Sequence, residues 1–401
     1  MTQALAEARI LVADDQGDVA RTLCGPLRKA GARLRYVSDG QAAIEAVAAQ
    51  PFDLVLVDMK MPPEEWGGLW LLRQLEAGGW RIPTLVLSGE GAKQQVIQAM
   101  RLGAADWIVK ENAGEELLDR CVSILGERLE QALAAASDQL PTPIAFRIAR
   151  YIRTTDPDKQ LAEGLHALES VLRLAATLGL ATTPPAPLRG ITPERLANPS
   201  MGTWFNLCTA LADVPGAGAG FGRLFSWLAP DSAVRQSVQE FITIRNDLAH
   251  GRAAPRRADR DRLDALLRRF AHRAASCGSS DLAVPTSMTF DGARYAVEVL
   301  VFRGTGKPNP DRVFTHTPVV NGTVLLLDRG AEPIPLAPLM ASADTQASGT
   351  ALCFQFDGLQ RGKAGPGPTT PLKYSRADDG DEAIGAYPTA TWPALAQWTA
   401  P

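Results

Sequence analysis

The sequence has few of the residues that build disulfide frameworks, zinc sites and membrane spans. Its five cysteines are far apart, odd in number and without a C-x-x-C pair, which excludes a disulfide scaffold or zinc finger and indicates reduced thiols. No apolar run approaches the roughly 18 residues that a spanning helix needs. The first residues also lack a basic stretch followed by an apolar one. We therefore expect a cytoplasmic protein with no membrane segment.

The chain is too long for one ordinary domain. Its 401 residues, of which 46% are hydrophobic, predict two or three domains. The net charge is only −3, but residues 126–277 carry 19 Lys and Arg against 15 Asp and Glu. A basic middle could attract nucleic acid, although a solvated helix face is the commoner cause of such a charge run.

Short apolar runs alternate with helical patterns over residues 1–125. Alternation of this kind is typical of βαβ units around a parallel sheet, so we predict an α/β doubly wound domain with five parallel strands. The helical patterns cover residues 17–30, 40–49, 68–77, 92–102 and 113 onward.

Five polar residues stand at the carboxyl ends of these apolar runs, namely Asp14, Asp15, Asp58, Ser88 and Lys110. The carboxyl ends of parallel strands meet at one edge of the sheet, where open α/β sheets bind their ligands. Carboxylates suit Mg²⁺ and can act as nucleophiles, whereas a lysine and a hydroxyl suit phosphate oxygens. Any one of these positions alone is more often a turn residue. The whole set predicts Mg²⁺-assisted phosphoryl transfer.

Four motifs carry a family resemblance. They are Ile10-Leu-Val-Ala-Asp-Asp15, Asp53-Leu-Val-Leu-Val-Asp58-Met-Lys-Met61-Pro62, Leu85-Val-Leu-Ser88-Gly and Gly103-Ala-Ala-Asp-Trp-Ile-Val-Lys110. With them, residues 8–125 resemble the receiver domain of bacterial two-component response regulators. The family usually has a proline after the lysine, where this chain has Glu111.

The resemblance implies a role for each site residue. Asp58 would be the phosphoacceptor, and Asp14 and Asp15 would form the acidic pair that holds Mg²⁺ with it. Ser88 would be the switch hydroxyl, Trp107 the switch aromatic, and Lys110 the phosphate-sensing lysine. A histidine kinase would be the phosphodonor, and self-phosphorylation would be the receiver's own chemistry.

A long helix is predicted after the receiver, over residues 115–139. Apolar residues step along it by four and three positions, which is the seam of a coiled coil; they are Leu118, Val122, Leu125, Leu129, Ala132 and Ala136. The seam would form either a two-stranded homodimer contact or a packing surface on the receiver.

Residues 140–277 are dominated by helical periodicity and predict an all-α domain. The helices are expected over residues 144–154, 159–180, 200–212, 221–229, 233–248 and 260–275. His166 lacks a lysine three residues later, so we interpret it as a surface histidine rather than a phosphotransfer residue.

One segment of this middle part carries a second motif, Arg245-Asn246-Asp-Leu-Ala-His250-Gly251. Gly251 is expected to end the helix. Arg245 falls in the centre of an apolar stripe, where its guanidinium must be paired or must line a cleft.

Together with Leu140-Pro-Thr-Pro-Ile-Ala and Gly202-Thr-Trp204, the motif resembles HEPN-type helical domains, many of which are metal-independent ribonucleases. In an active domain, Asn246 would orient the site, His250 would be the general acid or base on an RNA 2′-hydroxyl, and Arg245 would stabilise the phosphorane. An ideal helix separates Arg245 from His250 by about 140°, so the site would need two chains. The alternative is a non-catalytic dimerisation or sensing module.

The C-terminal part switches to β signals. Residues 282–376 predict a small β-rich domain, with strands over 294–302 and 350–356 and a hairpin turning at Asn321-Gly322. Residues 377–401 are expected to form a loose tail whose Trp392 and Trp398 dock on a partner or on the core.

Together these signals predict a multidomain response regulator with a HEPN-like output module that dimerises or senses. The alternative output is a phosphorylation-controlled ribonuclease acting on RNA. A transcription regulator ranks third, since the sequence shows no helix-turn-helix signature.

Overall fold

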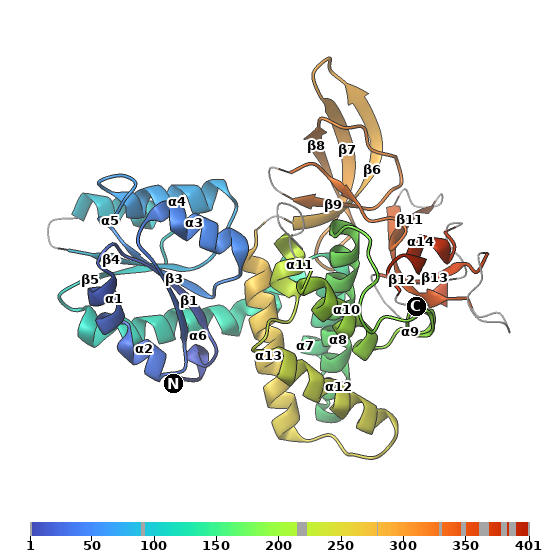
Figure 1. Ribbon diagram of the computed structural model, residues 1–401, viewed down its shortest axis with the longest axis horizontal. Helices are drawn as coiled ribbons and strands as arrows, with labels where there is room; N and C mark the ends of the chain where they lie inside the picture. The colour runs from blue at the N-terminus through green and yellow to red at the C-terminus, as the bar shows by residue number, and fades with distance from the viewer. Residues whose placement is uncertain are drawn as a thin grey trace. The chain divides into compact units, whose positions relative to one another are not determined.

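The computed structural model divides the chain into two compact units (Figure 1). Unit 1 comprises residues 1–132 and 268–278, and unit 2 comprises residues 133–267 and 279–401. The structure describes residues 2–89, 93–214, 223–278, 280–328, 331–345, 350–360, 369–377, 383–384 and 390–399. Much of the predicted loose tail therefore lies outside the described residues.

Unit 1 is built on a parallel sheet, as predicted. Its strands are β1 (Arg9–Ala13), β2 (Arg33–Val37), β3 (Leu54–Asp58), β4 (Thr84–Ser88) and β5 (Asp106–Val109), in the order β2-β1-β3-β4-β5. Every residue of β3 and of β4 is buried, which explains their unbroken apolar runs. The five-stranded doubly wound fold is thus confirmed.

Helices cover both faces of this sheet (Figure 1). One face packs against α1 (Gly17–Leu23), α2 (Gly25–Lys29) and α6 (Ala113–Gln139). A short 3₁₀ helix at Thr2–Leu5 precedes the first strand. The other face carries α3 (Gly40–Ala49), α4 (Gly67–Ala77) and α5 (Lys93–Arg101).

The helix predicted over residues 17–30 is in fact two helices that meet at Cys24. Pro26 stands in the first turn of the second helix and has no N–H to donate, so a continuous helix would lose a hydrogen bond there. The prediction of a single helix was wrong.

The last turns of α13 (Arg257–Ser276) belong to unit 1, although the helix begins in unit 2. The backbone N–H of Arg81 donates to the Ser276 carbonyl at 3.0 Å. Gly278 follows with φ +89°, and a Cβ there would stand 2.0 Å from the Gly79 carbonyl oxygen, so only glycine fits. The sequence placed residues 268–277 in the helical domain, whereas the structure groups them with the receiver.

Unit 2 gathers its helices around α8 (Pro157–Thr182), which contacts α7, α10, α11 and α12. The bounds of these helices are α7 (Thr142–Arg153), α10 (Met201–Ala212), α11 (Arg223–Leu228) and α12 (Arg235–Ala249), and a short helix, α9 (Pro193–Ala197), precedes α10. The capping box of Ser200 and Thr203 begins α10, and the Asp156 carboxylate caps α8.

Two antiparallel sheets complete unit 2. The first has the order β10-β9-β6-β7-β8, and the second β11-β12-β13-β14. Their strands are β6 (Ser280–Phe290), β7 (Tyr295–Phe302), β8 (Asn309–Thr315), β9 (Leu325–Asp328), β10 (Ile334–Pro335), β11 (Met340–Thr345), β12 (Thr350–Leu359), β13 (Leu372–Arg376) and β14 (Ala383–Ile384).

The predicted hairpin at Asn321-Gly322 is wrong. Gly322 has the expected φ of +76°, so the turn forms, but residues 316–320 directly before it form no strand. Val320 is 71% exposed and has no core to face, while β9 pairs with β6 and β10 instead.

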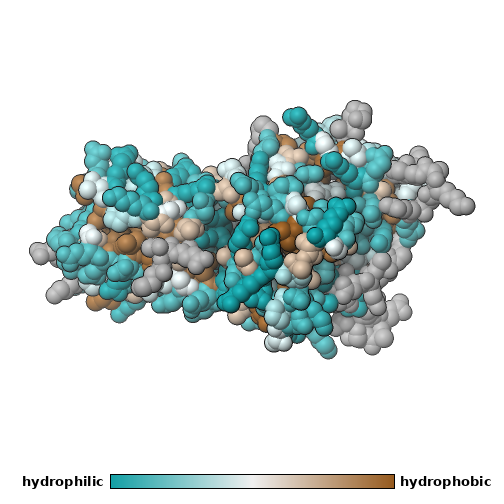
Figure 2. All heavy atoms as spheres, turned by 90° about the horizontal axis from the view of Figure 1, so that it is seen from below, coloured by the Kyte–Doolittle hydropathy of each residue, from teal (hydrophilic) through white to brown (hydrophobic). Residues whose placement is uncertain are grey.

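Part of the C-terminal tail is ordered on unit 2. The short helix α14 (Pro393–Ala396) lies between Trp392 and Trp398, and both indoles are buried. The face shown in Figure 2 is mainly hydrophilic, with hydrophobic residues in small patches. Among the described residues, no helix is both long and apolar enough to cross a bilayer.

Candidate functional site

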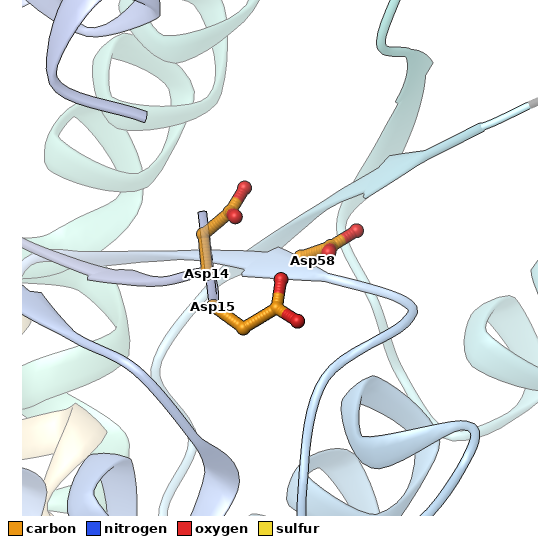
Figure 3. A group of neighbouring side chains, drawn as sticks. All are labelled: Asp14, Asp15 and Asp58. Carbon is orange, nitrogen blue, oxygen red and sulfur yellow. The ribbon is translucent and has the colours of Figure 1, made fainter. Parts of the chain in front are cut away.

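The carboxyl edge of the receiver sheet brings the predicted phosphoryl-transfer residues together. Asp14 and Asp15 follow β1, and Asp58 ends the neighbouring strand β3. Figure 3 shows the three carboxyl groups turned toward a common space. Each offers one oxygen, and these oxygens all lie within 4.8 Å of one another.

Lys110 joins two of these carboxylates. It follows β5, and its Nζ lies 3.0 Å from Oδ2 of Asp14 and 3.0 Å from Oδ2 of Asp58. Asp14 and Asp58 are each only 4% exposed, whereas Asp15 is exposed. Burying two carboxylates is costly unless a cation faces them, and the ammonium supplies part of that compensation.

The electrostatics of the site follow from this arrangement. Burial raises the pKa of Asp58, and the Asp14 carboxylate adds to the rise, while Lys110 opposes it. Burial by itself would lower the pKa of Lys110, but its contacts with Asp14 and Asp58 raise it overall. Three carboxylates against one ammonium leave the edge negative.

The donor set fits a hard divalent cation. Oxygen ligands from carboxylates are what Mg²⁺ prefers, and it commonly uses one or two of them together with water and a substrate phosphate. Asp14, Asp15 and Asp58 would hold the ion, which would offset the negative charge that the incoming phosphoryl group meets.

The two predicted switch residues occupy different environments. Ser88 ends β4 and is only 1% exposed, and its carbonyl accepts the Lys110 N–H at 2.8 Å. Trp107 lies on β5 and is 40% exposed. Ser88 is therefore buried and joined to Lys110 by a backbone hydrogen bond, while the aromatic ring of Trp107 is partly exposed to solvent.

The second motif lies at the end of α12 in unit 2. Gly251 ends the helix with φ +65°, and its N–H and that of Arg252 donate to the carbonyls of Leu248 and Asp247, which is the Schellman pattern. Arg245 is paired, since its Nη2 lies 3.2 Å from Oε2 of Glu169 on α8.

Asn246 and His250 stand one turn apart on α12 and are both exposed. The motif is therefore split within one chain. Its arginine is turned to a neighbouring helix, and its amide and imidazole face outward.

The sequence did not predict a buried ion-pair cluster at Asp53. Asp53 immediately precedes β3, is 0% exposed and accepts from the Arg9 N–H at 2.8 Å. Nε and Nη2 of Arg273 reach its two oxygens at 3.1 and 3.0 Å, and Nη1 of Arg269 lies 3.5 Å away. Nε2 of His272 lies 3.0 Å from the Asp53 carbonyl oxygen.

Burial of Asp53 opposes its ionisation, but the guanidinium of Arg273 and then that of Arg269 hold its pKa far below the usual range. Asp53 and Asp58 occupy opposite ends of the same strand. A pair separated by 220 positions leaves no local pattern in the sequence, so only the fold could show it.

Comparisons with known proteins agree with this geometry. A family model described as the response regulator receiver domain matches residues 10–122. Transcriptional regulatory protein FixJ of Bradyrhizobium diazoefficiens is 30% identical over 162 residues, which cover 40% of this chain and 75% of that protein. Response regulator MprA of Mycolicibacterium vanbaalenii is 31% identical over 148 residues, covering 35% of this chain and 63% of the relative.

Among solved structures, the receiver domain of NtrX from Brucella abortus is 29% identical, with a TM-score of 0.27, and covers 30% of this chain and 98% of that one. The relatives named here thus match less than half of the chain. Through its matched family model and the FixJ relative, the chain belongs to the response regulators of two-component systems, with a receiver domain over residues 10–122.

Proposed function

We propose that Asp58 accepts a phosphoryl group from a histidine kinase. The observation that carries this proposal is the position of Lys110, whose Nζ is 3.0 Å from both Asp58 and Asp14. An Asp58 oxygen attacks the phosphorus of the phosphohistidine, and the P–N bond breaks with its electron pair leaving on the imidazole nitrogen. Lys110 stays beside the oxygens that gain charge, and bound Mg²⁺ supplies further charge compensation.

Labelling by a small phosphodonor tests the assignment. The full chain incubated with acetyl phosphate and Mg²⁺ gains one phosphoryl group by intact mass, and Asp58→Asn gains none. Asp18→Asn is the matched control, because the Asp18 side chain on α1 is fully exposed and pairs with Arg21. Persistent labelling of Asp58→Asn would overturn the acceptor assignment.

We propose that unit 2 contains a HEPN-like output module that acts in dimerisation or sensing. Two helices support transmission from the receiver, because α6 and α13 each begin in one unit and end in the other without a break. The end of α13 reaches Asp53 at one end of β3, while Asp58 ends the same strand. A change at Asp58 can thus pass along β3 to Asp53 and through the Asp53–Arg273 ion pair to α13.

A ribonuclease activity is the second candidate for the output. It is favoured by the exposure of Asn246 and His250 on one face of α12, where a second chain or an RNA could meet them. Cleavage of RNA by the phosphorylated full chain, lost in His250→Ala and kept in His316→Ala, would support it. No cleavage by the wild type leaves the dimerisation or sensing module, which sedimentation with and without acetyl phosphate then tests.

Regulation of transcription is the third candidate, because the relative FixJ is named as a transcriptional regulatory protein. A shift of duplex DNA by the phosphorylated chain would favour it over both other outputs.

A further inference from the structure

Arginine side chains hold the last turns of α13 on unit 1. Arg268 is the first residue of α13 that belongs to this unit, and Arg269 and Arg273 follow it along the helix. The proposed route from Asp58 to α13 uses the ion pair of Arg273 with Asp53. That route does not use the contacts of Arg268, which lead to a different element of the unit.

Arg268 bonds the backbone of α6. Its Nη1 donates to the Leu129 carbonyl at 3.1 Å and to the Glu130 carbonyl at 2.8 Å. Both carbonyls lie inside a continuous helix, whose amide groups engage one lone pair of each oxygen. A carbonyl oxygen has two lone pairs, so it can also accept from the guanidinium. Because the acceptors belong to the main chain, the contact holds the helix itself.

This contact stands where both helices pass from one unit to the other. α6 leaves unit 1 after Ala132, and α13 enters unit 1 at Arg268. Leu129 and Glu130 precede Ala132 by less than one helical turn. A single side chain therefore joins the two helices within one turn of the point at which each of them changes unit.

Two bonds to neighbouring carbonyls fix the rotation of α6 as well as its distance. Successive carbonyls of an α-helix are separated by about 100° around the axis and about 1.5 Å along it. A roll or slide of α6 by one residue would therefore carry both acceptors away from Arg268. Arg269 resists a matching movement of α13, because its Nη2 donates to the Ala4 and Ala6 carbonyls at 3.2 and 2.9 Å.

We propose that Arg268 is a positioning residue that locks α6 to α13, so that a movement of α6 on phosphorylation reaches unit 2 through both helices together. The proposal rests on the proposed phosphorylation of Asp58, and it adds a second route to the one that runs along β3. Without the lock both helices stay continuous, but α6 can roll against α13. The movement then relaxes within α6 and is not passed to its neighbour.

The lock is measurable without any phosphodonor. Hydrogen exchange of the full chain, followed by mass spectrometry, reports local opening segment by segment. Charge-assisted hydrogen bonds are roughly twice as strong as neutral ones, so the loss of two of them should make opening about tenfold more frequent. In Arg268→Met, residues 126–132 of α6 and 268–272 of α13 should therefore both exchange about tenfold faster than in the wild type.

Arg128→Met is the matched control. Arg128 stands directly before Leu129 on α6, is exposed, and has no polar partner among the described residues. Its loss removes the same charge from the same stretch of helix without removing a bond to α13. Exchange in both segments should stay at the wild-type rate in this variant.

A second measurement adds acetyl phosphate and Mg²⁺, and intact mass verifies that each variant is labelled to the same extent. The readout is exchange in α7, which follows α6 along the chain, and in α12, which precedes α13. In the wild type and in Arg128→Met, phosphorylation should change exchange in these helices about fivefold or more, as for a typical coupling between two sites. In Arg268→Met the change should be about twofold or less.

Each outcome decides one claim. A full response of unit 2 in Arg268→Met, or faster exchange confined to one of the two joined segments, would overturn the lock. No response of unit 2 in a labelled wild type would do the same, because there would be no movement to carry. Labelling lost in Arg268→Met alone would also overturn it, since the residue would then act in the reaction. An unlabelled wild type would refute the phosphorylation of Asp58, while the measurement without phosphodonor still decides the lock. Circular dichroism of each variant verifies folding.

Discussion

The contact between Asp53 and Arg273 makes the docking of α13 on the receiver open to a quantitative test. Asp53 is fully buried, and Arg273 supplies two of its hydrogen bonds. Replacing Arg273 with methionine keeps the length of the side chain and removes the charge. Among the described residues, the Asp53 carboxylate then keeps the Arg9 N–H and the more distant Arg269 guanidinium.

The size of the effect follows from the burial. Removing one partner of a buried ion pair costs about 3–5 kcal/mol, because the other charge stays in a low-dielectric surrounding without compensation. Arg269, at 3.5 Å, offsets part of that loss, so the lower end of about 3 kcal/mol is expected. Opening of the docked segment then becomes about two orders of magnitude more frequent.

Hydrogen exchange measured by mass spectrometry reports this opening segment by segment. In Arg273→Met, peptides that cover residues 268–278 and the start of β3 should exchange about 100-fold faster than in the wild type, by the same conversion. Arg257→Met is the control on the same helix, because its side chain is 86% exposed and its loss costs roughly 0.5 kcal/mol or less.

A double variant distinguishes the energy of the Asp53–Arg273 ion pair from a general disruption of the structure around it. Asp53→Asn together with Arg273→Met removes both charges, so it should cost less than the sum of the single changes, by about 1–3 kcal/mol. Strict additivity, or unchanged exchange in Arg273→Met, would refute the view that this ion pair holds the helix on the receiver.

Three further expectations concern the same unit. Burial lowers the pKa of His272, so the imidazole stays neutral in the folded protein, while the unfolded chain binds a proton below about pH 6.5. The contribution of His272 to the free energy of unfolding is therefore present above that pH and is lost on acidification. In His272→Gln, the urea midpoint of unfolding should change less between about pH 7.5 and 5.5 than in the wild type. Lys110→Met should slow labelling by acetyl phosphate about tenfold at pH 7, because it leaves two buried carboxylates facing each other, while Lys60→Met should not. Gly278→Ala should destabilise the unit by about 2 kcal/mol or more through its backbone clash, whereas Gly292→Ala, with φ +101° and open space, should meet only conformational strain.

The receiver could be predicted closely from the sequence because its signals are local. Four of the five strands contain an apolar run of three or four residues, and Asp14, Asp58, Ser88 and Lys110 each follow such a run directly. The parallel arrangement then brings Asp14 and Asp58 to one edge whatever the details of packing. The break at Cys24 was missed because helical periodicity outweighed the signal of Pro26.

Pairings between distant segments were not predictable in this way. The requirement that Arg245 be paired was read from the apolar stripe, but its partner Glu169 lies 76 positions earlier. The turn at Asn321-Gly322 forms from its own chemistry, yet β9 pairs with β6 and β10 rather than with the residues before the turn.

The sequence by itself determined the receiver, its acidic edge and the end of α12 at Gly251, because glycine at positive φ and short apolar strands act over a few residues. Only the tertiary structure decided that the end of α13 joins the receiver and that Arg273 pairs with Asp53. Charged groups far apart in the chain pair when folding excludes water from both, and that exclusion is a property of the packed molecule.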